Sequence, residues 1–280
     1  MDNRPLLPIR IGGEPIGIPT IAALWANEYH LDHRRFYVTT RDDVRIAGIY
    51  LDRADTDSLV IYVHGFMAGK DHHHVPRFVQ AFSHFFDVMA IDLRGHGESG
   101  GGCTMGEMEV LDVEATIQYA RSLGYEHITT IGSSMGGATV IRHAALHQSQ
   151  NAVVTIGAFA DVSDIGRPNS DYGLHLLYNS GRLGEMWSYV TRGTRLANLR
   201  HHQTPLQLVG QVAPLPLLLI HGEWDVTVHP RAAQLLYDAA REPKRMILVE
   251  RGGHDAPHLT AATAQLIRDW MIEHGVDRAQ

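Results

Sequence analysis

The feature that most constrains the fold of this chain is a regular alternation of short apolar runs with longer amphipathic stretches. The run at 58–63 (SLVIYV) is apolar almost throughout, which is typical of a strand buried on both faces of a parallel sheet. The stretch at 105–123 places apolar residues at 108, 111, 115, 119 and 123, along one face of a helix. The alternation therefore predicts an α/β fold with helices covering both faces of a mostly parallel sheet.

The same patterns predict the individual elements. Strands are expected at 36–40, 44–51, 58–63, 88–91, 127–131, 152–156, 215–220 and 245–249. Helices are expected at about 76–86, 105–123, 134–147, 231–240 and 259–274. The first two strands must be antiparallel, because a parallel crossover needs roughly a dozen residues or more and the connection between them is only a few residues long.

Two segments depart from the alternation. The stretch 161–212 contains no clear strand, and because a structureless loop of about 50 residues is unusual, it predicts an inserted helical lid, or cap. The first residues, 1–35, form an N-terminal arm whose role the sequence does not reveal. This leaves 36–160 and 213–280 as the core of the fold.

Composition excludes several classes of function. The chain of 280 residues has 24 Lys and Arg against 31 Asp and Glu, a formal net charge of −7. Without a basic block it is not expected to bind nucleic acid, whose phosphates must be neutralised. No apolar run approaches the roughly 20 residues of a membrane-spanning helix, and the first residues lack a signal-peptide pattern. A single cysteine, Cys103, precludes internal disulfides and favours the cytoplasm; the oligomeric state is undetermined.

The most informative motif is Gly132-Ser133-Ser134-Met135-Gly136, between the strand at 127–131 and the helix at 134–147. The G-x-S-x-G spacing centres on Ser134 rather than Ser133. A tight strand–turn–helix holds the central serine in strained backbone geometry and needs glycines on both sides to avoid clashes. The hydroxyl is then presented at the helix N-terminus, where the helix dipole favours a developing negative charge. This context predicts that Ser134 is a nucleophile.

A serine nucleophile needs a base and an acid that orients the base. Asp225 follows the strand at 215–220 in the motif His-Gly-Glu-Trp-Asp, and His254 follows the strand at 245–249 after two glycines. The chain order Ser134, Asp225, His254 is the order expected for a nucleophile elbow on such a sheet. These residues are therefore the candidate catalytic triad.

The loop after the strand at 58–63 supplies the fourth part of the site. A tetrahedral intermediate needs two backbone N–H donors. Met135, directly after the nucleophile, is expected to supply one, and Phe66 in the sequence His64-Gly65-Phe66 the other. His64 itself is interpreted as bracing the loop rather than acting as a base.

Taken together, these motifs and the segment DLRGHGES at 92–99 resemble the α/β-hydrolase superfamily, over roughly residues 36–275. Within it the chain is most similar to serine hydrolases of the esterase, thioesterase and monoacylglycerol-lipase-like groups. The resemblance implies an eight-stranded, mostly parallel sheet with a lid inserted after the sixth strand. It also implies Ser134 as nucleophile, Asp225 as acid, His254 as base, and Phe66 and Met135 as the oxyanion hole.

The expected function is hydrolysis of a carboxylic ester or thioester of a small-molecule acyl substrate through an acyl-enzyme, without cofactor or metal. A carbon–carbon bond hydrolase or an acyltransferase would use the same triad, and a non-catalytic ligand-binding protein could occupy the same scaffold. Activity is expected to fall on acidification across roughly pH 6–7, where an imidazole base becomes protonated.

Several other residues are alternative site candidates. Asp92 is interpreted as a structural residue of its turn, and Asp161, after the strand at 152–156, as a weaker candidate for the triad acid. Cys103 has no visible base. The tract 72–74 (three histidines) is interpreted as a solvated helix start rather than a metal site, because adjacent residues do not share a helix face. The scattered histidines, His143 and His147 among them, are given no functional role.

Overall fold

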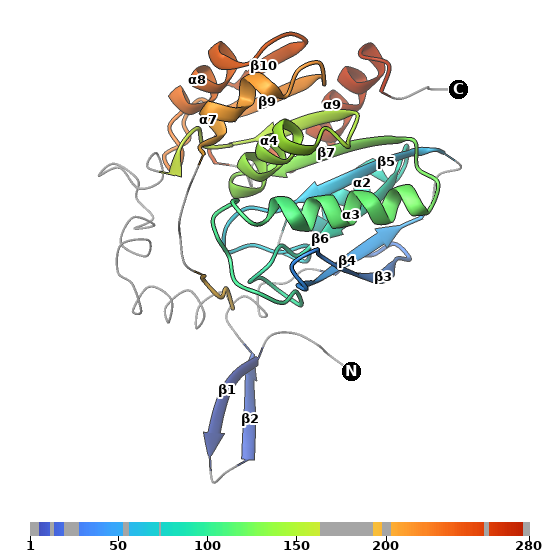
Figure 1. The fold of residues 1–280 in the computed structure, drawn as a ribbon, viewed down its shortest axis with the longest axis vertical. Coiled ribbons are helices and arrows are strands. Elements are labelled where there is room, and N and C mark those ends of the chain that lie inside the picture. Colours follow the sequence, from blue (N-terminus) through green and yellow to red (C-terminus); the bar gives the residue numbers. More distant parts are fainter. Residues whose placement is uncertain are drawn as a thin grey trace.

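A computed structural model describes residues 6–11, 14–19, 28–52, 56–72, 74–162, 193–197, 203–254 and 258–276. Its centre is an eight-stranded sheet in the order β10-β9-β8-β7-β5-β6-β4-β3 (Figure 1). The strands are β3 (Arg34–Thr39), β4 (Arg45–Leu51), β5 (Ser58–Val63), β6 (Asp87–Ile91), β7 (His127–Ser133), β8 (Ala152–Ile156), β9 (Leu217–Gly222) and β10 (Lys244–Val249). β4 pairs antiparallel with β3 and β6, and every other neighbouring pair is parallel. The predicted mostly parallel sheet and its antiparallel opening pair are confirmed.

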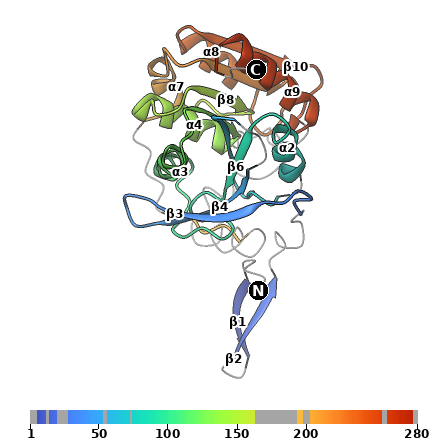
Figure 2. The ribbon, with the colours of Figure 1, turned by 90° about the vertical axis from the view of Figure 1, so that its right-hand side faces the viewer.

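Helices cover both faces of this sheet (Figure 2). They are α2 (Val75–Phe82), α3 (Val110–Ser122), α4 (Met135–His147), α7 (Pro205–Leu208), the 3₁₀ turn η2 (Val209–Gln211), α8 (Arg231–Ala239) and α9 (Ala261–Glu273). α2 and α9 pack together on one face, and α3, α4 and α8 lie on the other. This three-layer arrangement is the one that buried parallel strands require.

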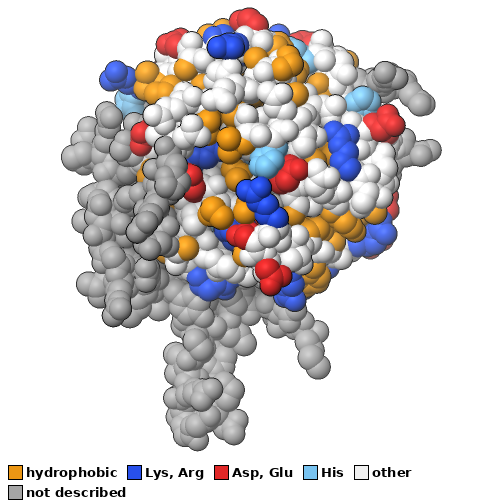
Figure 3. All heavy atoms as spheres, in the orientation of Figure 1, with side chains coloured by type: hydrophobic (Ala, Val, Ile, Leu, Met, Phe, Trp, Pro, Cys, Tyr) orange, Lys and Arg blue, Asp and Glu red, His pale blue; other side chains and the backbone are white. Residues whose placement is uncertain are grey.

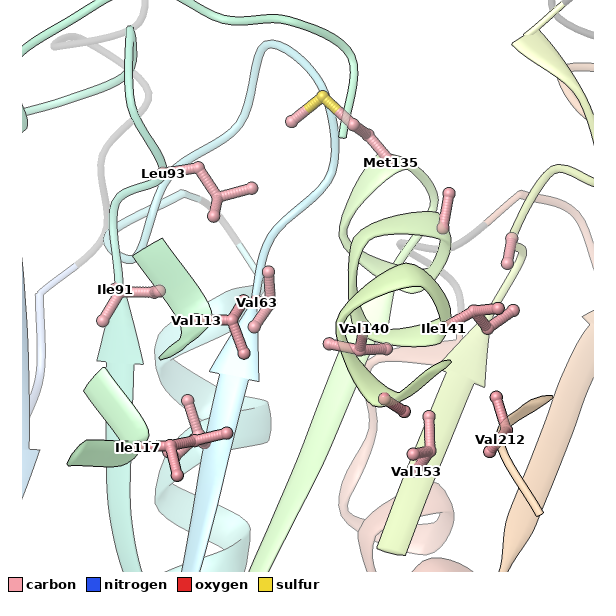
Figure 4. Close-up of a cluster of buried hydrophobic side chains, with 14 of the residues drawn as sticks. Val63, Ile91, Leu93, Val113, Ile117, Met135, Val140, Ile141, Val153 and Val212 are labelled. Carbon is pink, nitrogen blue, oxygen red and sulfur yellow. The ribbon is translucent and has the colours of Figure 1, made fainter. Parts of the chain in front are cut away.

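Side chains that alternate along the strands build two separate cores. On β5, Ile61 and Val63 point into the core beneath α3 and α4, whereas Val60 and Tyr62 point into the core beneath α2 and α9. Figure 4 shows the first of these cores, with Val140 of α4 among the side chains that line it. Both cores are sealed from water, which fixes the register of the sheet because a one-residue slip would exchange the two faces.

Two helix boundaries differ from the expected ones. α3 begins at Val110 rather than at 105, because Met105 and Gly106 have φ of 56° and 89° and cannot belong to a right-handed helix. The Glu109 carboxylate accepts hydrogen bonds from the backbone N–H groups of Thr104 and Gly106, which stabilises this turn instead. α2 ends at Phe82 rather than at 86.

Most of the expected lid lies outside the described residues, since 163–192 and 198–202 are not described. At the end of the 161–212 range, α7 and η2 pack against α4, with Leu208 and Val209 buried. In the N-terminal range, β1 (Leu6–Ile11) and β2 (Glu14–Pro19) form an antiparallel pair that projects from the body in Figure 1. Near the end of the 1–35 arm the chain contacts the core, because Tyr29 Oη donates a 2.6 Å hydrogen bond to the carbonyl of Lys70.

The surface is mixed in charge. On the face shown in Figure 3, acidic and basic side chains are interspersed with apolar ones instead of forming a patch of one sign. Among the described residues, no helix has the length and apolar character needed to cross a bilayer.

Candidate active site

Ser134 occupies a strained turn between β7 and α4. Its φ of 51° and ψ of −115° are unusual for a residue with a side chain, and it is the N-cap residue of α4. The backbone N–H of Ser134 donates to the Ile156 carbonyl at 2.8 Å, which ties the turn to the end of β8. The side chain of Ser134 is half-buried at the carboxyl end of the sheet. This is the geometry expected of a nucleophile elbow.

The flanking glycines are required by close backbone contacts. A Cβ placed on Gly132 would lie 2.2 Å from the carbonyl oxygen of Gly136, and a Cβ on Gly136 would lie 2.1 Å from that of Val63. Backbone atoms at these positions cannot move aside as a flexible side chain would. The two glycines therefore allow α4 to approach β5 closely enough to bring Ser134 above the strand ends.

Gly136→Ala is expected to destabilise the protein by about 3 kcal/mol or more, because the added methyl overlaps the backbone of β5. Gly100→Ala is the matched control, since its Cβ would find its nearest atom, the Arg45 carbonyl oxygen, at an ordinary 3.5 Å. Urea unfolding of both variants gives the comparison. Equal stability of the two would contradict the close-contact explanation.

The structure brings Ser134, His254 and Asp225 into one hydrogen-bonded chain. His254 Nε2 lies 3.0 Å from Ser134 Oγ, and His254 Nδ1 lies 2.6 Å from Asp225 Oδ2. Because the carboxylate can only accept, Nδ1 carries the proton and Nε2 is left to accept from the serine hydroxyl. Gly157, with φ of 65°, lies beside the His254 ring, where an added Cβ would come within 3.4 Å of it.

Asp225 is held rigidly and kept ionised. Its Oδ1 accepts from the backbone N–H groups of Thr227 at 2.9 Å and Val228 at 2.8 Å. Burial alone would raise the pKa of this carboxyl, but hydrogen bonds from His221, from His254 and from the backbone N–H of Val228 outweigh it and hold the pKa well below its ordinary value. The group is therefore a carboxylate at neutral pH, able to orient the imidazole.

The sequence motif does not predict a role for His221, and the structure shows one. Its Nε2 donates to the Val228 carbonyl at 2.8 Å and lies 3.2 Å from Asp225 Oδ2. It thus closes the loop that carries Asp225 and supports the carboxylate oxygen that faces His254. The spacing His-Gly-x-x-Asp was the available signal, because it places both side chains at the end of β9.

The two expected oxyanion donors follow neighbouring strands. Val63 of β5 pairs with Gly132 of β7 in the sheet. Phe66 follows Val63 by three residues, and Met135 follows Gly132 by three residues. Met135 is the first residue of α4, where backbone N–H groups have no partner inside the helix. Met135 is fully buried, and Phe66 is half-buried against the core. The two loops therefore meet at the same edge of the sheet as Ser134.

Two buried histidines brace the loops that follow β5 and β6. His64 Nε2 accepts the N–H of Leu93 at 2.9 Å, and His96 Nε2 accepts the N–H of Met67 at 3.2 Å. Each ring donates its Nδ1–H to a nearby backbone carbonyl, that of Gly65 for His64 and that of Arg94 for His96. Each loop therefore supplies a neutral imidazole that fixes the backbone of the other. Burial lowers the pKa of both rings, that of His96 to about 3.

His96 is expected to make stability fall on mild acidification. The unfolded chain protonates this side chain near pH 6.5, whereas the folded chain does so near its depressed pKa of about 3. Between these values the unfolded state binds the extra proton, so His96 removes about 2 kcal/mol of stability between pH 7 and pH 5. Urea unfolding at pH 7 and at pH 5 gives the free energy of unfolding at each pH. The loss between the two pH values should be smaller by about 2 kcal/mol in His96→Gln than in the wild type. An identical loss in both proteins would refute this role.

The remaining candidates lie elsewhere. Asp92 is buried and accepts from Lys70 Nζ at 3.0 Å and from the Glu98 N–H at 3.0 Å. Cys103 is buried beside Met135, with 3.6 Å between the two sulfur atoms, and burial raises the pKa of its thiol, which keeps it protonated. Asp161 follows β8 and is half-buried, and it is Asp225 that contacts His254. Of the tract 72–74, the middle residue lies outside the described part of the chain.

Comparisons with known proteins identify the fold. A family model described as alpha/beta hydrolase fold matches residues 58–206. The chain is 28% identical over 232 residues to an uncharacterised protein, YfhR, of Escherichia coli O157:H7, covering 77% of this chain and 71% of the relative. An esterase of Pyrococcus furiosus superposes with a TM-score of 0.66 at 23% identity, covering 87% of this chain and 90% of the esterase. An esterase domain of a Rhodothermus marinus protein superposes with a TM-score of 0.63 at 20% identity, covering 86% and 99%.

Proposed function

The chain belongs to the alpha/beta hydrolase fold family, and on that premise we propose that it is a serine hydrolase that cleaves carboxylic esters or thioesters. The observation that carries the proposal is the hydrogen-bonded chain from Asp225 through His254 to Ser134. A satisfied group of surface polar residues would not need a serine in strained backbone geometry at a helix N-terminus. The esterase neighbours in the comparisons support the same class of reaction.

The proposed reaction proceeds in two acyl-transfer steps. His254 Nε2 takes the hydroxyl proton of Ser134 as Oγ attacks the substrate carbonyl, and the carbonyl oxygen becomes an oxyanion. The backbone N–H groups of Phe66 and Met135 stabilise this oxyanion. His254 then passes the proton to the leaving alcohol or thiol, and the same ring activates water to release the acid. Asp225 fixes the tautomer of His254 and stabilises the imidazolium.

Exposed apolar side chains on the loop of Asp225 favour an apolar acyl group. Trp224 and Val226 flank Asp225 in the chain and are 61% and 50% exposed. Large apolar side chains left in water on the loop that carries the candidate acid offer a surface that an acyl chain can cover, a gain of roughly 0.8 kcal/mol for each buried methylene. We therefore expect esters of apolar acids to be preferred over those of charged acids.

Turnover of p-nitrophenyl esters from acetate to palmitate tests the proposal. The expected result is saturable hydrolysis that rises with chain length over the shorter esters, with an early burst of nitrophenol as the acyl-enzyme accumulates. Hydrolysis of esters of a dicarboxylic acid of matched length should be slower. A folded sample with no turnover of any ester or thioester would overturn the proposal, and product formation only with an added alcohol would assign acyl transfer instead.

A further inference from the structure

Helices α3 and α4, which cover one face of the sheet, bring three side chains together at a place away from Ser134. Glu114 belongs to α3, and His143 and His147 belong to α4. His143 Nε2 lies 2.8 Å from Glu114 Oε2, and His147 Nδ1 lies 4.0 Å from the same oxygen. The ligand atoms of these three residues all fall within 4.8 Å of one another. None of them takes part in the proposed reaction.

The two imidazoles lie on one face of α4. Residues four apart on a helix share a face, and the rings of His143 and His147 are stacked at 5.0 Å between centroids and 15° between planes. A metal binds an imidazole nitrogen in the plane of the ring, so the two rings must turn out of this stack to point one nitrogen each at a shared ion. Two imidazole nitrogens and one carboxylate oxygen are three of the four ligands that Zn²⁺ takes in tetrahedral sites, with water as the fourth. Ligand atoms in such a site are about 3.3 Å apart, so atoms that now lie within 4.8 Å of one another must close by up to roughly 1.5 Å as the side chains turn.

The hydrogen bonds to Glu114 fit a carboxylate ligand. Its Oε2 accepts from His143 Nε2 at 2.8 Å and from Ser149 Oγ at 2.7 Å, and its Oε1 accepts from Gln118 Nε2 at 2.8 Å. A carboxylate is the ligating form of this side chain.

The far side of His143 supplies an independent observation. His143 is fully buried, and its Nδ1 lies beside the Gln150 side chain without a well-formed hydrogen bond to it. The Gln150 amide nitrogen and oxygen are likewise buried and unpartnered within the described part of the chain. With its proton on Nδ1 instead of Nε2, His143 could donate to the Gln150 oxygen and turn a bare Nε2 toward Glu114. Metal-bound histidines are usually fixed by such a bond to their other nitrogen.

The site has an entry path and lies apart from the nucleophile. The side chains of Glu114 and His147 are each 24% exposed, so an ion and a water ligand can reach them from solvent. His143 follows Ser134 by nine residues along α4, a distance of roughly 13 Å at 1.5 Å per residue. A second cluster among the described residues, formed by Asp57, Glu126 and His127, is largely exposed and lacks paired imidazoles.

We propose that Glu114, His143 and His147 form a Zn²⁺ site that clamps the C-terminal end of α4 to α3. Binding requires the single ring proton of neutral His143 to move, by exchange with solvent, from Nε2 to Nδ1, which breaks the hydrogen bond to Glu114 and leaves Nε2 free to bind the ion with no net release of a proton. The clamp stabilises the fold and does not enter the acyl-transfer reaction. This assigns a role to two histidines that the sequence pattern left without one.

Calorimetric titration of the metal-free protein with Zn²⁺ tests the site. The variants are Glu114→Gln, which keeps the shape and an acceptor for His143, and His147→Phe, which keeps the ring stack. Both are expected to lose on the order of 100-fold or more in affinity at the tightest step. His229→Ala removes an exposed histidine outside the cluster and is expected to bind as the wild type does.

Thermal unfolding provides a second readout. At a Zn²⁺ concentration about 100 times the dissociation constant, the melting temperature of the wild type and of His229→Ala should rise by roughly 5 °C, and that of Glu114→Gln and His147→Phe should not. The proposal is overturned if the wild type binds no Zn²⁺. It is equally overturned if both cluster variants, shown to be folded by circular dichroism, bind Zn²⁺ as tightly as the wild type, which would place the ion on other histidines such as the tract 72–74.

Discussion

Replacing Ser134 with alanine is expected to lower kcat for ester hydrolysis by roughly 10³-fold or more. The variant removes the only atom that forms the acyl-enzyme bond, while the oxyanion donors and the binding surface stay in place. The loss should therefore appear in kcat, with little change in the melting temperature, because the small side chain of Ser134 is half-buried and donates no bond that supports the fold. Steady-state kinetics with a p-nitrophenyl ester measures both parameters.

The neighbouring serine supplies a matched control. Ser133 is buried, and its Oγ lies 2.8 Å from the hydroxyl of Tyr62, whose side chain belongs to the core beneath α2 and α9. Ser133→Ala is expected to cost about 1 kcal/mol of stability through the lost hydrogen bond and to leave kcat within about tenfold of the wild type. If Ser134→Ala kept activity within tenfold of the wild type, the assignment of the nucleophile would be wrong.

Asp225→Asn is expected to lower kcat by about 10³- to 10⁴-fold, the second large effect. The amide is nearly the same size as the carboxylate, but its NH₂ group can donate to His254 Nδ1 and so favours the tautomer with the proton on Nε2. That tautomer cannot accept the proton of Ser134. The imidazolium formed during attack would also lose the negative charge that stabilises it. Kinetics of the purified variant on the same ester provides the measurement.

Asp161→Asn is the natural comparison, because Asp161 is the alternative acid that the sequence suggests at the end of β8. Since His254 Nδ1 lies 2.6 Å from Asp225 Oδ2, this variant is expected to keep kcat within about tenfold of the wild type. A large loss in Asp161→Asn together with near-normal activity in Asp225→Asn would transfer the acid role to Asp161.

The sequence predicts the order and kind of the strands well because the sheet is buried on both faces. An apolar run such as Ser58–Val63 has no other stable environment in a chain of this composition. The nucleophile elbow can also be predicted, because its G-x-S-x-G spacing marks the turn directly in the sequence. The contact that requires Gly132 lies within the motif, at the carbonyl oxygen of Gly136, whereas the contact that requires Gly136 is with Val63 of β5.

What the sequence does not reveal depends on contacts between distant elements. The start of α3 is displaced by backbone turns at Met105 and Gly106, and the Glu109 carboxylate that stabilises them is not marked by any periodicity. The reciprocal bracing by His64 and His96 needs two loops to meet across neighbouring strands. Glu114 and His143 are 29 positions apart, so only the packing of α3 on α4 makes them partners. The lid expected within 161–212 lies largely outside the described residues.

Intact-mass measurement after incubation with a fluorophosphonate shows whether Ser134 is activated. Such a probe reacts with a serine whose hydroxyl is deprotonated by an adjacent base, and not with ordinary serines. The expected result is a single adduct on the wild type and on Ser133→Ala, and none on Ser134→Ala. An unmodified wild-type mass in a folded sample, or an adduct that persists in Ser134→Ala, would contradict it.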